Sequence, residues 1–145
     1  MKKIKLLFAV VIFFSIAFSD AGEKPSFVIV VHKSVPIEKL SQKELSDIFL
    51  KKIRTWDNGS AIKPVDLGSA SKVRETFSKQ IHKRKISSIK AYWQKQIFTG
   101  KGVPPPEKNS DKEVLNYLAE NRDTIGYISV KTKIDTNVVK IIELR

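Results

Sequence analysis

An uninterrupted apolar segment over residues 27–31 (FVIVV) sets the strongest constraint on the fold of this chain. Such a run of mostly β-branched side chains is typical of a strand that is buried on both faces, as in a parallel sheet. Helical patterns follow this segment, and short strand patterns lie between them. A chain that alternates strands with helices in this order predicts one α/β domain with a mixed, partly parallel sheet.

Four helices are expected from their caps and from their apolar spacing. Ser41 precedes Glu44 by three residues, which is the capping-box pattern and predicts a helix over 41–50. Ser110 and Glu113 repeat this pattern at the start of the last helix. The two helices between them carry apolar residues four apart: Val73, Phe77 and Ile81 in one, and Ile89, Trp93 and Ile97 in the other, which Ser87 or Ser88 caps.

Strands are expected over 27–31, 62–66, 124–130 and 138–144, and residues 100–106 form an extended, proline-rich loop. Trp93 is best interpreted as a buried anchor of its helix, although a platform for stacking a sugar or a base is the alternative.

The N-terminus has the pattern of a secretory signal peptide. Lys2, Lys3 and Lys5 precede an apolar run over 6–18, and small residues surround a cleavage point after Ala21. An uncleaved membrane anchor is the alternative, but a membrane span needs about 20 apolar residues and this run is shorter. We therefore expect a signal peptide over 1–21, a periplasmic domain over 22–145 and no membrane-spanning segment after cleavage.

The charge balance favours anionic partners. The chain carries 27 Lys and Arg against 15 Asp and Glu, and it has no Cys, which excludes disulfides, thiolate metal sites and a Cys nucleophile. Export makes nucleic acid the least expected of the anionic partners. The two His residues lie in no catalytic or metal-binding motif, so we expect no enzyme, no metal and no cofactor.

The most informative local feature is the turn between a strand and a helix at residues 66–74. Free amides at a helix N-terminus suit a phosphate or a similar oxyanion, and Gly68, Ser69, Ser71 and Arg74 would contribute to such a site. The alternative is that Ser71 only caps the helix while Arg74 faces water. Ser34 follows the first strand and is added to the candidate site, because ligands in open α/β sheets bind beyond the carboxyl ends of strands.

A basic band accompanies the second and third helices. It consists of Lys79, Lys83, Arg84, Lys85, Lys90 and Lys95. A solvated surface is the usual explanation, and contact with an anionic surface is the functional one.

Several blocks resemble the phosphate-binding proteins of ABC uptake systems. Residues 30–36 (VVHKSVP) and 40–59 (LSQKELSDIFLKKIRTWDNG) are similar to a family segment that reads Leu-Thr-x-x-x-Leu-x-x-Ile-Phe-x-Gly-x-Ile-x-x-Trp. Residues 91–93, 98–105 and 125–129 resemble later blocks. In full-length members the binding turn reads Arg-x-x-Gly-Ser-Gly-Thr, and residues 67–73 retain this pattern only in part.

The resemblance implies a single-lobe, type II periplasmic-binding-protein-like domain, with a mixed sheet and about four helices. It also implies binding of phosphate or another oxyanion, with an ABC permease or a second subunit closing the site. The alternative function is an envelope interaction module, whose basic face would bind anionic polymers, lipopolysaccharide or a membrane partner.

Overall fold

The structure is a computed structural model that describes residues 25–145. The predicted signal peptide over 1–21 lies outside the described residues. The helices are α1 (Gln42–Phe49), α2 (Lys72–Phe77), the π-helical turn η1 (Ser78–His82), α3 (Ile86–Phe98) and α4 (Asp111–Glu120). The strands are β1 (Phe27–His32), β2 (Lys39–Leu40), β3 (Lys63–Pro64), β4 (Asp66–Leu67), β5 (Glu107–Lys108), β6 (Thr124–Ser129) and β7 (Val139–Leu144).

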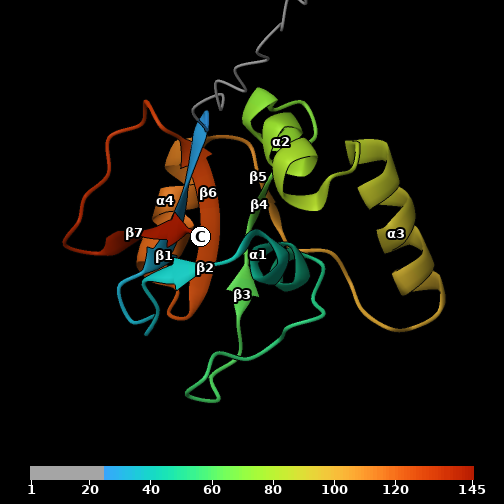
Figure 1. Cartoon of the computed structure of the whole chain (residues 1–145), viewed down its shortest axis with the longest axis horizontal. Helices are drawn as coiled ribbons and strands as arrows, with labels where there is room; N and C mark the ends of the chain where they lie inside the picture. Colours follow the sequence, from blue (N-terminus) through green and yellow to red (C-terminus); the bar gives the residue numbers. More distant parts are fainter. Residues whose placement is uncertain (1–24) are drawn as a thin grey trace, which may run out of the picture.

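The main sheet is mixed and has the strand order β2-β7-β1-β6-β3. β2 and β3 run parallel to their neighbours β7 and β6, and β4 and β5 form a separate parallel pair. Figure 1 shows the main sheet at one side of the molecule and α3 at the other, with α1 and α2 between them. The predicted α/β class with a mixed, partly parallel sheet is confirmed.

β1 is the central strand, but its direction differs from the prediction. It pairs antiparallel with both β6 and β7, whereas the apolar run favoured a parallel strand. The run is continuous because both faces of the strand are covered: α4 packs on one side, and α1 and α2 lie on the other (Figure 1). Burial on two faces removes the polar alternation whatever the strand direction.

The core joins the sheet to the helices through aromatic stacking. The ring of Tyr127 on β6 stacks on Phe77 of α2 with centroids 3.8 Å apart, and Phe49 and Phe27 meet the Phe77 ring edge-on. On the opposite face of β6, a Cβ on Gly126 would lie 2.9 Å from Val114 of α4. The close approach of α4 to the sheet therefore requires a glycine at this position. All buried hydrophobic residues of the described chain lie between Phe27 and Ile142.

The helix caps follow the predictions in part. At α1, Ser41 and Glu44 form the complete capping box. At α4, Ser110 caps the backbone of Glu113, but the Glu113 carboxylate accepts from the amide of Asn109 at 2.8 Å, so the box is incomplete. α3 begins at Ile86, before the expected Ser caps. The predicted strand over 62–66 is divided into β3 and β4.

α3 attaches to the body through a small cluster of its own. Ile89 and Trp93 are buried against Leu50, and the Tyr92 hydroxyl donates to the Leu50 carbonyl at 2.8 Å. The prediction that Trp93 is a buried anchor is confirmed. Ile97 is wrongly predicted as part of the same buried face, because 53% of it is exposed. Across residues 25–145, no helix combines the length and the apolar character needed to cross a membrane.

Candidate functional site

The turn that the sequence singled out follows β4 directly. The amide of Gly68 donates to the Lys108 carbonyl at 2.9 Å, which ties the start of the turn to β5. Ser69 and Ala70 are exposed, and within the described residues neither amide donates a hydrogen bond. Ser71 is the N-cap of α2, and its hydroxyl accepts from the amide of Arg74 at 3.2 Å. The expected strand, turn and capped helix are therefore present.

Arg74 is buried in an ion cluster rather than exposed. Its Nη1 lies 3.1 Å from the Asp66 carboxylate and 3.2 Å from the Glu107 carboxylate, and it also donates to the Leu67 carbonyl. The side chain is only 5% exposed. The interpretation in which Arg74 faces water is wrong. Because the protein's own acceptors occupy this nitrogen, direct contact between Arg74 and a ligand stays a prediction.

Asp66 connects the cluster to the core. Its Oδ1 accepts hydrogen bonds from the Tyr127 hydroxyl and from the amide of Leu67, the latter at 3.0 Å. Burial raises the pKa of Asp66 to about 6, although the nearby Arg74 guanidinium opposes this rise. Burial and the adjacent Asp66 raise the pKa of Tyr127 well above its ordinary value. Asp66 therefore holds Arg74 and Tyr127 together in a site from which most water is excluded.

A cavity of about 190 Å³ lies beside this cluster. Its walls include Asp66, Arg74 and Glu107 on one side and Trp93 of α3 on the other. Lys90 of α3 also borders the cavity, and its Nζ lies 3.3 Å from the hydroxyl of Ser69. The arrangement places a surface ammonium group next to the exposed amides of the turn, which is a chemistry that suits an oxyanion.

Sequence reasoning placed Lys90 in the basic band and overlooked Asp66 and Glu107 as members of the cluster. Glu107 comes 33 residues after Arg74 and reaches it only because β4 pairs with β5. A strand of two residues leaves no periodic signal in the sequence, so this contact has no local signature. Lys90 is likewise brought to Ser69 only by the docking of α3.

Ser34 does not join the other candidate residues. Its hydroxyl is 2.8 Å from Nδ1 of His32 and accepts from the amide of Asp123, which directly precedes β6. Since β1 is antiparallel to β6, the end of β1 lies at the start of β6, whereas the Gly68 turn follows β4 toward the opposite end of the sheet. The expectation that Ser34 belongs to the same site rested on a parallel β1 and is corrected here.

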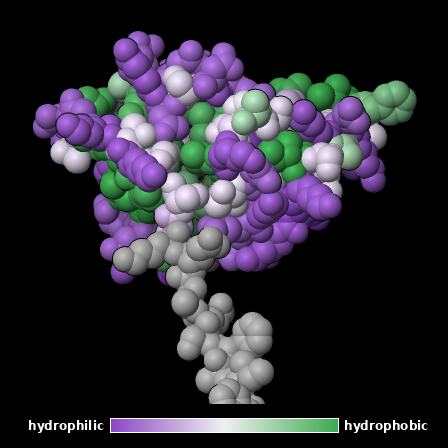
Figure 2. Space-filling view, turned by 90° about the horizontal axis from the view of Figure 1, so that it is seen from above, coloured by the Kyte–Doolittle hydropathy of each residue, from purple (hydrophilic) through white to green (hydrophobic). Residues whose placement is uncertain are grey.

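No group of three or more metal-binding side chains comes together within the described part of the chain. The surface around the turn is largely hydrophilic (Figure 2). The site therefore offers hydrogen-bond donors, one free ammonium group and an internally paired ion cluster.

Residues 25–143 match the model of the PBP superfamily domain. The chain belongs to this family. An ABC-type phosphate transport receptor from Vibrio cholerae has a similar fold, with a TM-score of 0.65 and 22% identity over 82% of this chain and 46% of the receptor. A putative phosphate ABC transporter substrate-binding protein with bound phosphate from Clostridium perfringens gives a TM-score of 0.62 and 19% identity, over 82% of this chain and 44% of that protein.

PstS from Borrelia burgdorferi is a third structural relative, with a TM-score of 0.58, 18% identity, and coverage of 83% of this chain and 47% of PstS. No curated protein sequence matches the chain. This PBP superfamily domain thus spans less than half the length of these structural relatives and corresponds to one lobe of their fold. The resemblance found in the sequence blocks is confirmed at the level of family and fold.

Proposed function

We propose that this PBP superfamily domain binds phosphate or a similar oxyanion at the turn formed by residues 68–71. The observation that carries the proposal is the position of Lys90, whose Nζ lies 3.3 Å from Ser69 Oγ beside amides that are exposed to solvent. The hydroxyl of Ser69 and the amides of Ser69 and Ala70 would donate to the oxyanion, and Lys90 would supply the neutralising charge. Ser71 and Arg74 would hold the turn in shape.

The charges around the turn explain why Lys90 is needed. Arg74 faces two carboxylates, Asp66 and Glu107, so the cluster carries no positive excess when both are ionised. Without another cation, an oxyanion beside this cluster would meet repulsion. Lys90 has an exposed side chain that no carboxylate of the described residues holds in an ion pair, and it can turn toward a bound ion.

A single lobe leaves one side of the ion open to water. The chain spans less than half of structural relatives whose names refer to phosphate transport or phosphate binding. Half a shell of donors forfeits several charge-assisted hydrogen bonds, each of which contributes about 1.5 to 3 kcal/mol. We therefore expect a Kd in the high micromolar range or weaker for one chain. A second copy or an ABC permease in the cell envelope would tighten binding by closing over the site.

Calorimetric titration with phosphate and with sulfate tests this proposal. The protein would start at Gly22, which preserves every described core residue. Lys90→Met and Ser69→Ala should each weaken binding by about fivefold or more, because each removes a charge or a donor. The matched control is Lys112→Met, which removes an exposed charge on α4. If Lys90→Met binds the anion as well as Lys112→Met does, the site is wrongly placed.

A further inference from the structure

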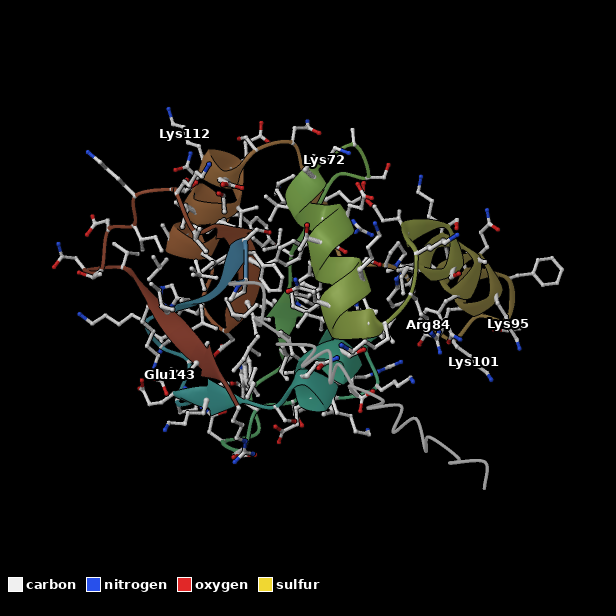
Figure 3. All side chains as sticks on the ribbon, turned by 45° about the horizontal axis from the view of Figure 1, so that its top comes forward. Lys72, Arg84, Lys95, Lys101, Lys112 and Glu143 are labelled. Atoms are coloured by element: carbon white, nitrogen blue, oxygen red, sulfur yellow. The ribbon has the colours of Figure 1, made fainter. Side chains whose placement is uncertain are left out.

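The α3 region has an unusual charge distribution. Between Glu75 and Glu107 the sequence contains no Asp or Glu, although this stretch includes η1, α3 and the loop that follows. Its basic residues are all exposed, and they are Lys79, Lys83, Arg84, Lys85, Lys90, Lys95 and Lys101. Figure 3 shows Arg84, Lys95 and Lys101 at the same end of the molecule as α3, while Lys112 lies at the opposite end. This end therefore has a strongly positive surface with no compensating carboxylate of its own.

Apolar side chains project at the far end of the same helix. Phe98, the last residue of α3, is 93% exposed, and the nearby Ile97 and Val103 are 53% and 61% exposed. None of them belongs to the clusters that hold the fold together. Figures 1 and 2 show α3 standing away from the sheet, with a hydrophobic group extending from that end of the surface.

The tip is held in a defined conformation. Gly100 has φ of 67°, and the amide of Lys101 donates to the Gln96 carbonyl at 2.8 Å, so the chain folds back immediately after the helix. Arg54 donates from Nη2 to the Lys101 carbonyl at 3.1 Å and ties this loop to the body. Phe98 is therefore presented on a closed, hydrogen-bonded turn, and docking would require little further ordering of the backbone.

We propose that the tip of α3 docks onto an anionic phospholipid surface, with Phe98 and Ile97 entering the interfacial region and Lys95 and Lys101 contacting lipid phosphates. An aromatic residue that projects among lysines matches the layered chemistry of such a surface, which is anionic outside and apolar beneath. The lysine stems can extend along the apolar side chains while their ammonium groups reach the phosphates. A convex tip of this kind suits a fluid lipid interface better than a protein surface, which would need a pocket of matching shape.

This docking role is separate from oxyanion binding. The lysines at the tip, Lys95 and Lys101, are absent from the walls of the cavity beside the Gly68 turn. Loss of lipid binding would leave the proposed oxyanion site intact, and loss of the oxyanion site would leave the tip intact.

Vesicle co-sedimentation provides the first test, with the chain that starts at Gly22. Vesicles that contain phosphatidylglycerol should bind the protein, whereas vesicles of phosphatidylcholine alone should bind it weakly. Phe98→Ser should weaken binding to anionic vesicles by roughly fivefold or more, and Lys95→Glu with Lys101→Glu by roughly tenfold or more. Free phosphate at constant ionic strength should not displace the protein from the vesicles.

The matched controls lie elsewhere on the surface. Ile141→Ser removes a half-exposed apolar side chain from β7, and Lys112→Glu with Lys131→Glu makes the same change in net charge away from α3. Both controls should stay within about threefold of the parent. If the controls weaken binding as much as the α3 variants do, attraction is a property of net charge alone and the proposal fails.

Fluorescence of Phe98→Trp tests insertion directly. The native Trp56 and Trp93 are both buried, so a change on lipid binding would report mainly on position 98. We expect emission to shift to shorter wavelength with anionic vesicles, together with reduced quenching by acrylamide. Lipid binding without these changes would contradict insertion of the tip. Absence of any vesicle binding would contradict the proposal and would direct the search to an acidic protein partner for α3.

Discussion

Arg74 and Asp66 form a buried ion pair, with 3.1 Å between the guanidinium Nη1 and the carboxylate Oδ2. Through this pair the first turn of α2 is held against the end of β4, and through the Tyr127 hydroxyl it is held against the centre of the main sheet. The turn with the exposed Ser69 and Ala70 amides is thus supported by a rigid polar cluster. Its shape is set before any ligand arrives.

Removing one partner of this pair should be costly. Arg74→Met leaves the Asp66 carboxylate buried without its cation, and we expect a loss of roughly 3 to 5 kcal/mol in the free energy of unfolding. Asp66→Asn with Arg74→Met should lose less than the sum of the two single variants, because no unpaired charge remains. Chemical denaturation measures these values, with Lys79→Met as the control for loss of an exposed ion pair with Glu75. An additive double variant would contradict coupling between the two side chains.

The pH dependence of stability should show two opposing contributions. Burial raises the pKa of Asp66 to about 6, so its contribution is present at low pH and is lost as pH rises from about 4 to 6. Burial, together with Arg74, Arg84 and Lys52, lowers the pKa of His82 to about 4, so its contribution is present above about pH 6.5 and is lost as pH falls toward 4. The two slopes partly cancel in the parent protein.

Asp66→Asn removes one of these slopes. Between pH 4 and 6 its free energy of unfolding should therefore rise more steeply with pH than that of the parent, and the difference should accumulate to about 3 kcal/mol. Denaturant melts at several pH values measure this directly. Parallel pH profiles for the two proteins would show that Asp66 titrates normally in the fold.

Gly126→Ala tests the contact between α4 and the sheet. The added methyl would lie 2.9 Å from Val114 and 3.0 Å from Val65, closer than a carbon contact allows. We expect a loss of about 1 to 3 kcal/mol, because α4 must move away from β6. Gly59→Ala serves as a comparison in which backbone strain and not crowding applies, since nothing lies within 4 Å of that position. A thermal melt of Gly126→Ala equal to that of the parent would contradict this packing.

Trp93→Ala should release α3 from the body before it affects the sheet. Trp93 packs with Leu50 and Ile89 in a cluster separate from the main core. Loss of a buried Trp costs about 3 to 5 kcal/mol, which is comparable with the docking energy of one short helix. Hydrogen exchange should accelerate over residues 86–98 while β1 and β6 remain protected. Uniform acceleration throughout the domain would show that α3 and the sheet unfold as one unit.

The sequence predicts the elements of this fold better than their pairing. The cap at Ser41 and the buried face of Trp93 depend on local spacing, and the structure has both. The direction of β1 does not follow from its residues, because an apolar run records burial on two faces and contains no information on strand polarity. The position of Ser34 was wrong for this reason alone.

The candidate site was predictable only in outline. The turn after β4 and the Ser71 cap are local features, and both are present. The partners of Arg74 are not local, since Glu107 reaches it through a pairing of two-residue strands. Lys90 has the appearance of an ordinary surface lysine in the sequence, and only the docking of α3 brings it to Ser69.

Nuclear magnetic resonance titration of the 15N-labelled chain with sulfate is the most direct test of the proposed oxyanion site, because sulfate keeps its charge across neutral pH. At constant ionic strength, the amide resonances of Ser69 and Ala70 should shift in a saturable way, and Lys90→Met should abolish most of that shift. Shifts confined to residues 83–85, or the same shifts in Lys90→Met as in the parent, would contradict an oxyanion site at this turn.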